Sequence, residues 1–400
     1  MCKNKSFLNT GNITNCSGCG ACIQVCPKKC IEFRKNEDGF LYPNIDLNMC
    51  IHCKKCEIIC PYNAEILSTL PVHSYAVQAK DKDILLKSSS GGVFFLLAKK
   101  CIESGGIVYG AIMQEDFSCK HSSAETLEEL QYLLKSKYVQ SRADIVYPSV
   151  MKNIKAGRRT LFSGTPCQVD GLNRYLGKYA KYSNYICIDV ACHGVPSEED
   201  FKCCINALEK KHKGKIINIE FRDKDKSGWK HALTYTIRKE EKEKTYTKLP
   251  YQILYYYFFL YSRNIRKSCY SCEYAMKKRI SDITLSDFWS VSKIFNNFDT
   301  SLGVSGVMCN SIKGYKEFCK IYSDIIYVET SEDMIAMNNQ PFNGHTDYYI
   351  DRDKLLKTVM SYGYDNAKIY FKKKERVVAF AKSLISDKVK EFIISKQGDK

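Results

Sequence analysis

Apolar residues follow two different patterns along this chain, and the change between them comes after residue 70. In the first segment, closely spaced cysteines separate short apolar runs, and Asp38-Gly39 between two such runs predicts a β-hairpin turn. In the next segment, strand-length and helical apolar runs alternate: we expect a strand at 74–79, a helix at 93–103 and a strand at 107–113. The first segment is therefore expected to be a small module, and the rest an α/β region.

Two consecutive strand–turn–helix units follow. Residues 160–162 and 185–191 are short apolar strands, each followed by a turn and a helix, and 197–200 has the pattern of a capping box. Consecutive units of this kind place their strands parallel, so a partly parallel sheet is expected. Farther along, we expect an antiparallel patch from 216–221, 231–239 and 245–249, an apolar helix at 249–264 and a strand at 282–288.

The C-terminal tail is rich in lysine. Its apolar side chains fall at helical spacing and predict an amphipathic basic helix; they are Val377, Phe380, Ala381, Leu384, Ile385, Val389, Phe392 and Ile393. Such a helix can lie on an anionic membrane or an acidic partner, but packing on its own domain is more common, and we prefer it. The predicted segments are thus 1–70, 71–150, 151–335 and 336–400.

Cysteines carry the strongest chemical signal. The pattern C-x2-C-x2-C-x3-C-P occurs twice, at Cys16, Cys19, Cys22 and Cys26, and at Cys50, Cys53, Cys56 and Cys60. This is the spacing of bacterial ferredoxins with two 4Fe–4S clusters, in which the fourth cysteine of each run binds the other cluster. We therefore assign one cluster to Cys16, Cys19, Cys22 and Cys60, and the other to Cys50, Cys53, Cys56 and Cys26.

Zinc is the alternative occupant, because Cys-x2-Cys pairs also make zinc sites. Two complete runs, each closed by Cys-Pro, favour iron–sulfur clusters. Cys2 and Cys30 fall outside the spacing, and we do not assign them as ligands.

Composition narrows the function classes. The chain has 21 cysteines and a net charge of +17. In a reducing compartment so many cysteines indicate metal binding rather than disulfides. No apolar run is long enough for a transmembrane segment, and the N-terminus lacks a signal peptide, so we expect a cytoplasmic protein. The charge suggests nucleic acid, but no helix-turn-helix or zinc-finger pattern accompanies it and anionic clusters would offset part of it, so no nucleic-acid partner is expected.

Two segments have the chemistry of an anion site. The first is Ser88-Ser89-Ser90-Gly91-Gly92 directly before the helix at 93–103, where free amides and a positive helix end attract a phosphate. A serine N-cap on an ordinary helix explains the same residues equally well. The second, Ser136-Lys137-Tyr138-Val139-Gln140-Ser141, offers a cation, an aromatic face and an amide, although a solvated loop explains it as well.

Four further cysteines are candidates for a third site. Cys167 and Cys192 each follow a predicted parallel strand, at the sheet edge where open α/β sheets bind ligands. Cys269 and Cys272 form a later pair. Together they make a plausible four-thiolate site for a third cluster, but buried free thiols or half of a zinc site are equally good explanations of the spacing alone.

These strings together resemble the beta subunit of coenzyme F-420 (deazaflavin) hydrogenases and dehydrogenases, fused to a two-cluster ferredoxin. The matching strings are SSSGG at 88–92, VYGA at 108–111, SKYVQS at 136–141, FSGTPCQVDGL at 162–172, CHGVPS at 192–197, FRDK…GW at 221–229 and CYSCEY at 269–274. SDITLSDFW at 281–289 completes the set, with Ser286 and Ser290 where the family usually has glycine. The resemblance implies an α/β flavin-binding region after a ferredoxin-like module, FAD beside a 4Fe–4S cluster, and Cys167, Cys192, Cys269 and Cys272 as its ligands.

The resemblance also implies residue roles and partners. Ser88, Ser89, Ser90, Gly91, Gly92, Ser136, Lys137, Tyr138 and Gln140 become the expected FAD contacts, with His193 and Lys137 as catalytic candidates. The expected function is an FAD-dependent iron–sulfur oxidoreductase that exchanges a hydride with an unidentified substrate. The alternative is an electron-relay subunit with no substrate of its own. In either case a redox partner protein, such as a ferredoxin or a dehydrogenase subunit, is expected.

Overall fold

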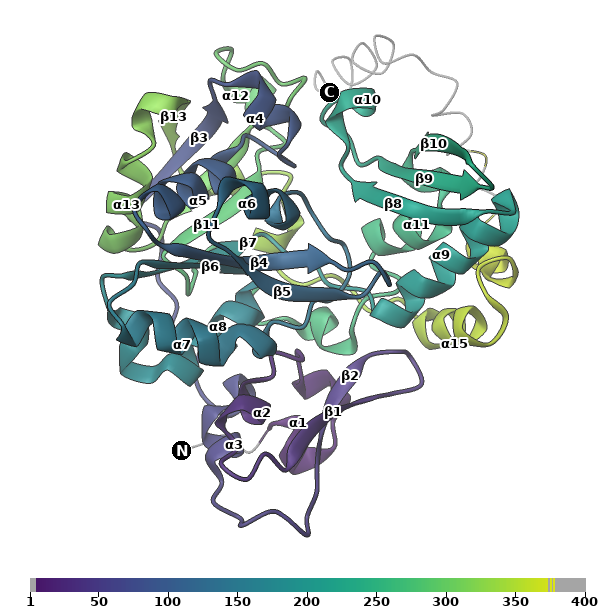
Figure 1. Cartoon of the computed structure of the whole chain (residues 1–400), viewed down its shortest axis with the longest axis horizontal. Coiled ribbons are helices and arrows are strands. Elements are labelled where there is room, and N and C mark those ends of the chain that lie inside the picture. The colour runs from purple at the N-terminus through teal and green to yellow at the C-terminus, as the bar shows by residue number, and fades with distance from the viewer. Residues whose placement is uncertain (1–4, 373–374, 376, 378–400) are drawn as a thin grey trace.

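The computed structural model describes residues 5–372, 375 and 377. Its N-terminal module lies at one end of the molecule (Figure 1). Strands β1 (Ile31–Lys35) and β2 (Leu41–Ile45) pair antiparallel, and Gly39 turns between them with a φ of 78°, which confirms the predicted hairpin. The module also contains the short helices α1 (Phe7–Thr10), α2 (Ala21–Val25) and α3 (Lys55–Ile59).

An eight-stranded sheet in the order β13-β3-β12-β11-β7-β6-β4-β5 forms the centre of the remaining chain. The neighbours β11, β7, β6 and β4 are parallel, and the outer strands pair antiparallel, so the predicted partly parallel sheet is confirmed. The strands are β3 (His73–Ala79), β4 (Ile107–Met113), β5 (Cys119–Ala124), β6 (Thr160–Gly164), β7 (Tyr185–Val190), β11 (Ile283–Asp287), β12 (Ser305–Cys309) and β13 (Ile325–Thr330). Residues 71–150 and 151–335 thus share one sheet.

Helices cover both faces of this sheet (Figure 1). One face carries α5 (Val93–Glu103), α6 (Leu127–Leu133) and α13 (Ile312–Cys319), which share an apolar core with the strands. The other carries α7 (Tyr147–Lys155) and α8 (Pro166–Leu176). The N-terminal module packs beneath α8, because Cys19 and Ala21 belong to the same buried cluster as Val169 and Leu172.

A glycine makes this contact between module and helix close. A Cβ added at Gly171 of α8 would lie 2.7 Å from the Cβ of Cys19 and 2.9 Å from its Sγ. Any larger residue would push the Cys19 loop away from α8, so Gly171 fixes how near the module approaches the sheet.

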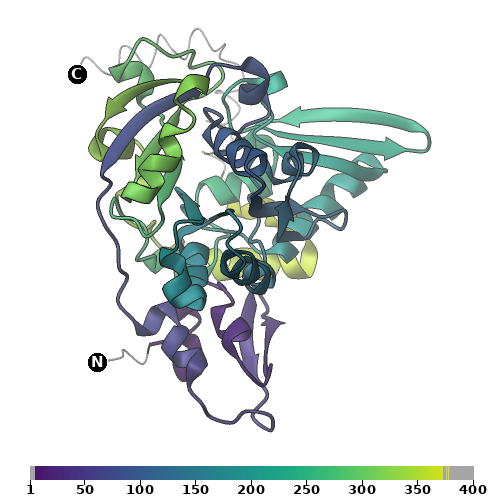
Figure 2. The ribbon, with the colours of Figure 1, turned by 60° about the vertical axis from the view of Figure 1, so that its left-hand side comes forward.

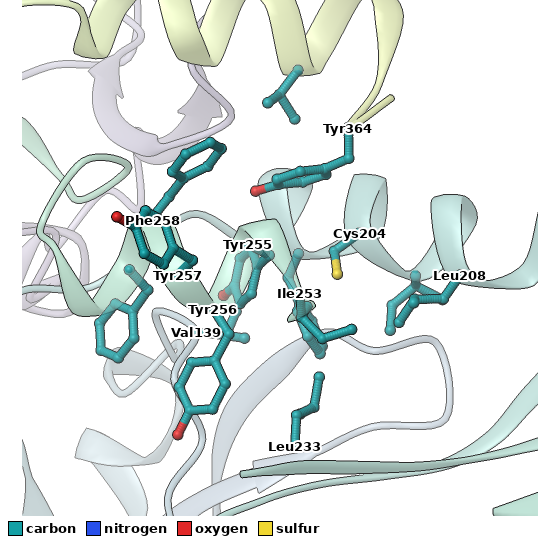
Figure 3. Close-up of a cluster of buried hydrophobic side chains, with 14 of the residues drawn as sticks. Val139, Cys204, Leu208, Leu233, Ile253, Tyr255, Tyr256, Tyr257, Phe258 and Tyr364 are labelled. Carbon is teal, nitrogen blue, oxygen red and sulfur yellow. The ribbon is translucent and has the colours of Figure 1, made fainter. Parts of the chain in front are cut away.

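A separate three-stranded antiparallel sheet, in the order β10-β9-β8, projects from the body (Figure 2). It comprises β8 (Lys215–Phe221), β9 (Leu233–Lys239) and β10 (Lys242–Lys248), and it confirms the predicted antiparallel patch. Helices α9 (Glu198–His212), α11 (Leu254–Leu260) and α15 (Arg352–Tyr362) pack beside it. Figure 3 shows the aromatic core between them, in which Tyr255, Tyr256 and Phe258 of α11 are fully buried.

Some expected elements differ in extent. The helix expected at 249–264 is limited to Leu254–Leu260, because Pro250 starts a separate short 3-10 turn and Ser262 adopts a left-handed φ of 53°. Ser197 caps α9 by accepting from the Asp200 amide at 3.2 Å, but the Asp200 carboxylate binds Tyr364 and Asn264 instead of closing a capping box. The remaining short helices are α4 (Lys82–Leu86), α10 (Lys224–Ser227), α12 (Val291–Ile294) and α14 (Glu332–Ala336).

The helix α15 was not expected from the sequence, and most of the predicted amphipathic tail lies outside the described residues. Within the described part of the chain, no helix combines the length and apolar character needed to cross a bilayer.

Candidate functional site

The described structure contains cysteine-lined cavities that we call the middle, outer and inner sites. The middle site is a small cavity in the N-terminal module, lined by Cys16, Cys19, Cys22 and Cys60. Gly18 and Gly20 in its loop have φ of 74°, a left-handed conformation that glycine adopts readily in so tight a turn. Burial, followed by repulsion from the neighbouring thiolates, raises the pKa values of Cys19 and Cys22. Four ionised thiolates therefore need a cationic occupant here.

The outer site is the second cavity of the module, lined by Cys26, Cys50, Cys53 and Cys56. The two cavities of the module thus group the cysteines as the sequence assignment expects, with the fourth cysteine of each run in the site of the other run. Cys53 is exposed, whereas every other cysteine of the three sites is buried or half-buried. Cys30, which the spacing leaves unassigned, also lines this cavity, with its Sγ 3.4 Å from that of Cys26. Cys2 lies outside the described residues.

The inner site is a cavity lined by Cys167, Cys192, Cys269 and Cys272, which come from three separate regions of the chain. Cys167 is in the first turn of α8 after β6, and Cys192 follows β7. Burial raises the pKa values of all these thiols and, together with repulsion from adjacent thiolates, brings them to about 12 for Cys192 and about 11 for Cys272. The topology therefore brings the predicted third set of cysteines together.

The spacing of the thiols suits clusters rather than single ions. Among residues 5–372, 375 and 377, no three His, Cys, Asp or Glu side chains converge closely enough to hold one metal ion. A zinc ion needs its sulfur ligands about 2.3 Å away, whereas a 4Fe–4S cubane fills the space between four separated thiolates. The geometry gives the zinc alternative no support.

Arg266 is a buried cation between the middle and inner sites. Its Nε donates to the Cys16 carbonyl oxygen at 2.7 Å, and one of its terminal nitrogens lies 3.5 Å from the Cys16 Sγ. Its own carbonyl accepts from the Cys269 amide at 2.9 Å. Arg279 and Arg352, equally buried, pair with carboxylates, but no ion pair of the described residues involves Arg266. Because a buried cation needs a counter-charge, anionic clusters on either side would complete this arrangement.

The large cavity, of about 310 Å³, lies beside the inner site. One wall is the N-terminal turn of α5, where Gly92 is the N-cap with a φ of 86° and no side chain caps the helix. The serine N-cap explanation is therefore wrong for this helix. Ser89 and Ser136 line the same region, their hydroxyl oxygens 3.0 Å apart. Uncapped amides, hydroxyls and a glycine are the groups that hold a pyrophosphate, so these residues fit FAD.

The inner and large cavities share a wall. Thr165, Cys192, His193, Gly194 and Val195 line both. His193 is fixed there by its Nε2, 3.2 Å from the Phe259 carbonyl oxygen.

Not every residue expected to contact FAD lies on the large cavity. The residues that do are Ser88, Ser89, Ser90, Gly92, Ser136, Lys137 and Tyr138. Gly91 does not: a Cβ there would lie 2.2 Å from the Val77 carbonyl oxygen, so sheet packing explains this glycine. Gln140 is also absent from the wall, because its side chain donates to the Ser17 carbonyl oxygen of the module at 2.9 Å and accepts from Arg266 at 3.1 Å. The assignment of Gly91 and Gln140 as FAD contacts is wrong in this geometry.

Lys137 reaches the cavity wall with its ammonium turned toward the end of α6. Its Nζ donates to the Tyr132 carbonyl oxygen at 2.8 Å and to that of Leu134. Burial lowers the pKa of Lys137 to about 8.

Several polar residues at the large cavity were missed by the sequence reasoning. Asp287 lines it and accepts from Arg222 at 2.8 Å and from the Trp229 indole at 3.0 Å. Burial favours the neutral acid, but the Arg222 guanidinium overrides it and lowers the pKa of Asp287. His121 also lines it, between the Ser141 hydroxyl at 3.0 Å and the Ser163 carbonyl oxygen at 2.9 Å. The strings FRDK and DFW contain Arg222 and Asp287 and could have indicated them. No pattern in the sequence indicates His121.

Two domain comparisons match the segments that contain these sites. The model of the 4Fe–4S dicluster domain matches residues 15–64, which include all the cysteines of the middle and outer sites. The model described as the C terminus of the coenzyme F420 hydrogenase/dehydrogenase beta subunit matches residues 157–333, which include those of the inner site. The chain therefore contains the C-terminal domain of the coenzyme F420 hydrogenase/dehydrogenase beta subunit, preceded by a 4Fe–4S dicluster domain.

Two individual proteins are similar to parts of this chain. An uncharacterized ferredoxin of Methanocaldococcus jannaschii is 40% identical over 55 residues, which are 14% of this chain and 70% of that protein. The F420-reducing [NiFe] hydrogenase complex of Methanosarcina barkeri, studied by xenon derivatization, includes a chain that is 16% identical. That likeness covers 76% of this chain and 92% of the other, with a TM-score of 0.43, and is too distant to carry an argument. The domain matches and the ferredoxin support an iron–sulfur protein with a redox role.

Proposed function

We propose that this protein is an iron–sulfur flavoprotein oxidoreductase, which passes electrons between its 4Fe–4S clusters and an FAD in the large cavity. The observation that carries the proposal is the series of shared walls. Ser17 and Tyr62 line both the middle and the inner cavities, and Cys192 to Val195 line both the inner and the large ones. Neighbouring redox groups in this series would exchange electrons without crossing solvent.

The proposed third cluster is held by the thiolates of the inner site. The Cys192 thiol donates to the Gly194 carbonyl oxygen at 3.7 Å, and both residues lie in the wall shared with the large cavity. The inner site would therefore stand between the ferredoxin-type module and the flavin.

FAD supplies the exchange between one-electron and two-electron transfer when it is bound. The first-turn amides of α5, with Ser89 and Ser136, are the proposed pyrophosphate contacts. Phe259 and Leu285 add an apolar wall for the flavin ring. The transferred hydride combines two electrons with one proton, and Lys137 and His193 are the proposed proton donors on the wall, acting at Nζ and at an imidazole nitrogen.

Cofactor analysis after anaerobic purification tests the proposal. We expect about twelve irons and one FAD per chain. Iron near eight with FAD present would remove the inner cluster. A chain with full iron and no FAD would refute the flavoprotein and favour an electron-relay subunit without its own substrate.

A further inference from the structure

The outer site is surrounded by a surface of unusual composition, which we call the outer rim. It consists of the exposed apolar residues Leu47, Met49, Ile51 and Ile58 and the exposed lysines Lys28, Lys54 and Lys55. Ile51 is 55% exposed and Ile58 69% exposed. So many large apolar side chains within a short stretch of surface usually mark a contact with another molecule.

The outer rim belongs to the same cavity as the outer cluster. Lys28, Ile51, Lys54 and Lys55 line it together with the cysteines, and Cys53 is exposed between them. The loop from β2 to α3, which carries most of the rim, lies at the end of the molecule farthest from the large sheet (Figures 1 and 2). Of the three thiol sites, this one is nearest to anything that approaches from solvent.

Charge determines what the rim would attract. None of the ion pairs among the described residues involves Lys28, Lys54 or Lys55. The nearest acidic residue in the sequence is Glu32 for Lys28 and Glu57 for Lys54 and Lys55, and Glu32 pairs with Arg34. Unpaired lysines around an apolar centre suit a partner whose own apolar patch is ringed by carboxylates, because complementary charge steers association and apolar contact holds it.

We propose that the outer rim is the docking surface for an acidic one-electron carrier protein, of the flavodoxin or ferredoxin type. This inference rests on the proposed function, since it gives the outer cluster its external partner. One electron leaves the reduced carrier and enters the outer cluster, and no bond forms or breaks. A lipid surface also attracts lysines and apolar side chains, but an exposed redox site at the centre of the patch favours a redox protein.

A stopped-flow experiment tests the docking surface. Reduced flavodoxin, an acidic carrier, is mixed anaerobically with the oxidised holoprotein, and bleaching of the cluster absorbance gives the rate. The test variant is Lys28→Glu/Lys55→Glu. The matched control is Lys239→Glu/Lys242→Glu, which changes the same charge at an exposed pair of the β9–β10 hairpin. We expect the rate to fall about tenfold or more in the test variant and to change by less than about twofold in the control.

Salt dependence and a carrier of opposite charge test whether charge on the outer rim controls the rate. Added salt should slow the wild-type reaction with flavodoxin, and the basic carrier cytochrome c should oxidise the reduced test variant faster than the wild type. An unchanged flavodoxin rate in the test variant, or an equal loss in both variants, would overturn the docking surface. So would lysine-dependent binding to anionic phosphatidylserine vesicles with an unchanged flavodoxin rate. Reduction by dithionite distinguishes failure of the docking surface from failure of the proposed function. If dithionite bleaches no cluster in the wild type, the proposed function itself fails.

Discussion

The outer and inner sites hold the same kind of ligand in opposite surroundings. Cys53 of the outer site is exposed and is surrounded by lysines and apolar side chains of the outer rim. The inner site lies inside the molecule, and Cys167, Cys192 and Cys269 reach it from separate elements. Burial raises the pKa of Cys192 to about 12, so the surrounding protein opposes ionisation unless iron is bound.

Under the proposed function, this contrast would separate two tasks of an electron path within one chain. A site that exchanges electrons with other proteins must be reachable, and a site next to a flavin must be shielded from solvent. Three cysteines of the outer site come from one loop and the start of α3, and Cys26 comes from the end of α2, so all of them belong to the small N-terminal module. The inner site is tied to β6 and β7 of the large sheet, so its position is set by the whole α/β fold.

The largest expected effect comes from breaking the inner site. Cys269→Ser should remove about four of twelve irons and slow electron transfer to the bound flavin by at least about a hundredfold, because the step between module and flavin is lost. Iron analysis and single-turnover flavin reduction measure this. Cys309→Ala is the control, since Cys309 is buried in the apolar core away from all three sites. Full iron content in Cys269→Ser would show that this thiol is not a ligand.

Breaking the outer site should have a different outcome. Cys53→Ser should also cost about four irons, yet FAD should remain bound, because the large cavity proposed for it lies in the region of the large sheet. The electron paramagnetic resonance spectrum should lose one cluster signal, and the released flavin should be counted after denaturation. Loss of FAD together with the outer cluster would mean that the two regions depend on each other more than their separation suggests.

A smaller effect is expected from the buried arginines near the module. Arg266→Gln should lower the reduction potential of the middle cluster by on the order of 60 mV, about 1.4 kcal/mol, because a positive charge beside the Cys16 sulfur is removed. Arg352→Gln is the control: this arginine is equally buried and also lies over the Phe40 ring, but it pairs with Asp38.

The two arginine variants separate charge from packing. Both should lower the free energy of unfolding by on the order of 2 kcal/mol, whereas only Arg266→Gln should move the potential in a redox titration. A shift of equal size in Arg352→Gln would attribute the effect to general loosening of the interface.

The smallest expected effect concerns flavin affinity. Lys137→Ala should weaken FAD binding about three- to tenfold, since its ammonium is already engaged with carbonyl groups at the end of α6. Titration of apoprotein with FAD measures this, and Lys87→Ala, an exposed lysine directly before Ser88, serves as the control. Gly91→Val is no test of flavin binding, because its Cβ would strike the Val77 carbonyl oxygen and unfold the region.

The contrast between the two sites also explains what the sequence could predict. The cysteines of the module follow strict local spacing, so their grouping was available from the sequence alone. The inner site needed the fold, because only parallel pairing of β6 and β7 brings Cys167 near Cys192. The antiparallel strands and the helix at 93–103 were predicted because their apolar periodicity is regular.

Side-chain direction within a motif was not predictable. Within 136–141, Ser136 and Tyr138 line the large cavity, but Gln140 turns to the module, and no pattern in six residues distinguishes them. Gly91 had the composition of a phosphate loop, yet its role is close packing against the Val77 carbonyl. The position of His121 on the large cavity could not be predicted, because a lone histidine in a strand is more often an ordinary core residue.

The close contact of Gly171 with Cys19 has a kinetic consequence. Because the ferredoxin-type module is part of the same chain and rests directly on α8, electron transfer from the middle site inward requires no encounter between separate molecules. Its rate should be first-order and independent of protein concentration, whereas exchange at the outer rim should rise with the concentration of the carrier. A larger residue at position 171 would push the module away from the sheet, although the chain would still connect them. The distance between the middle and inner sites would then vary instead of being fixed.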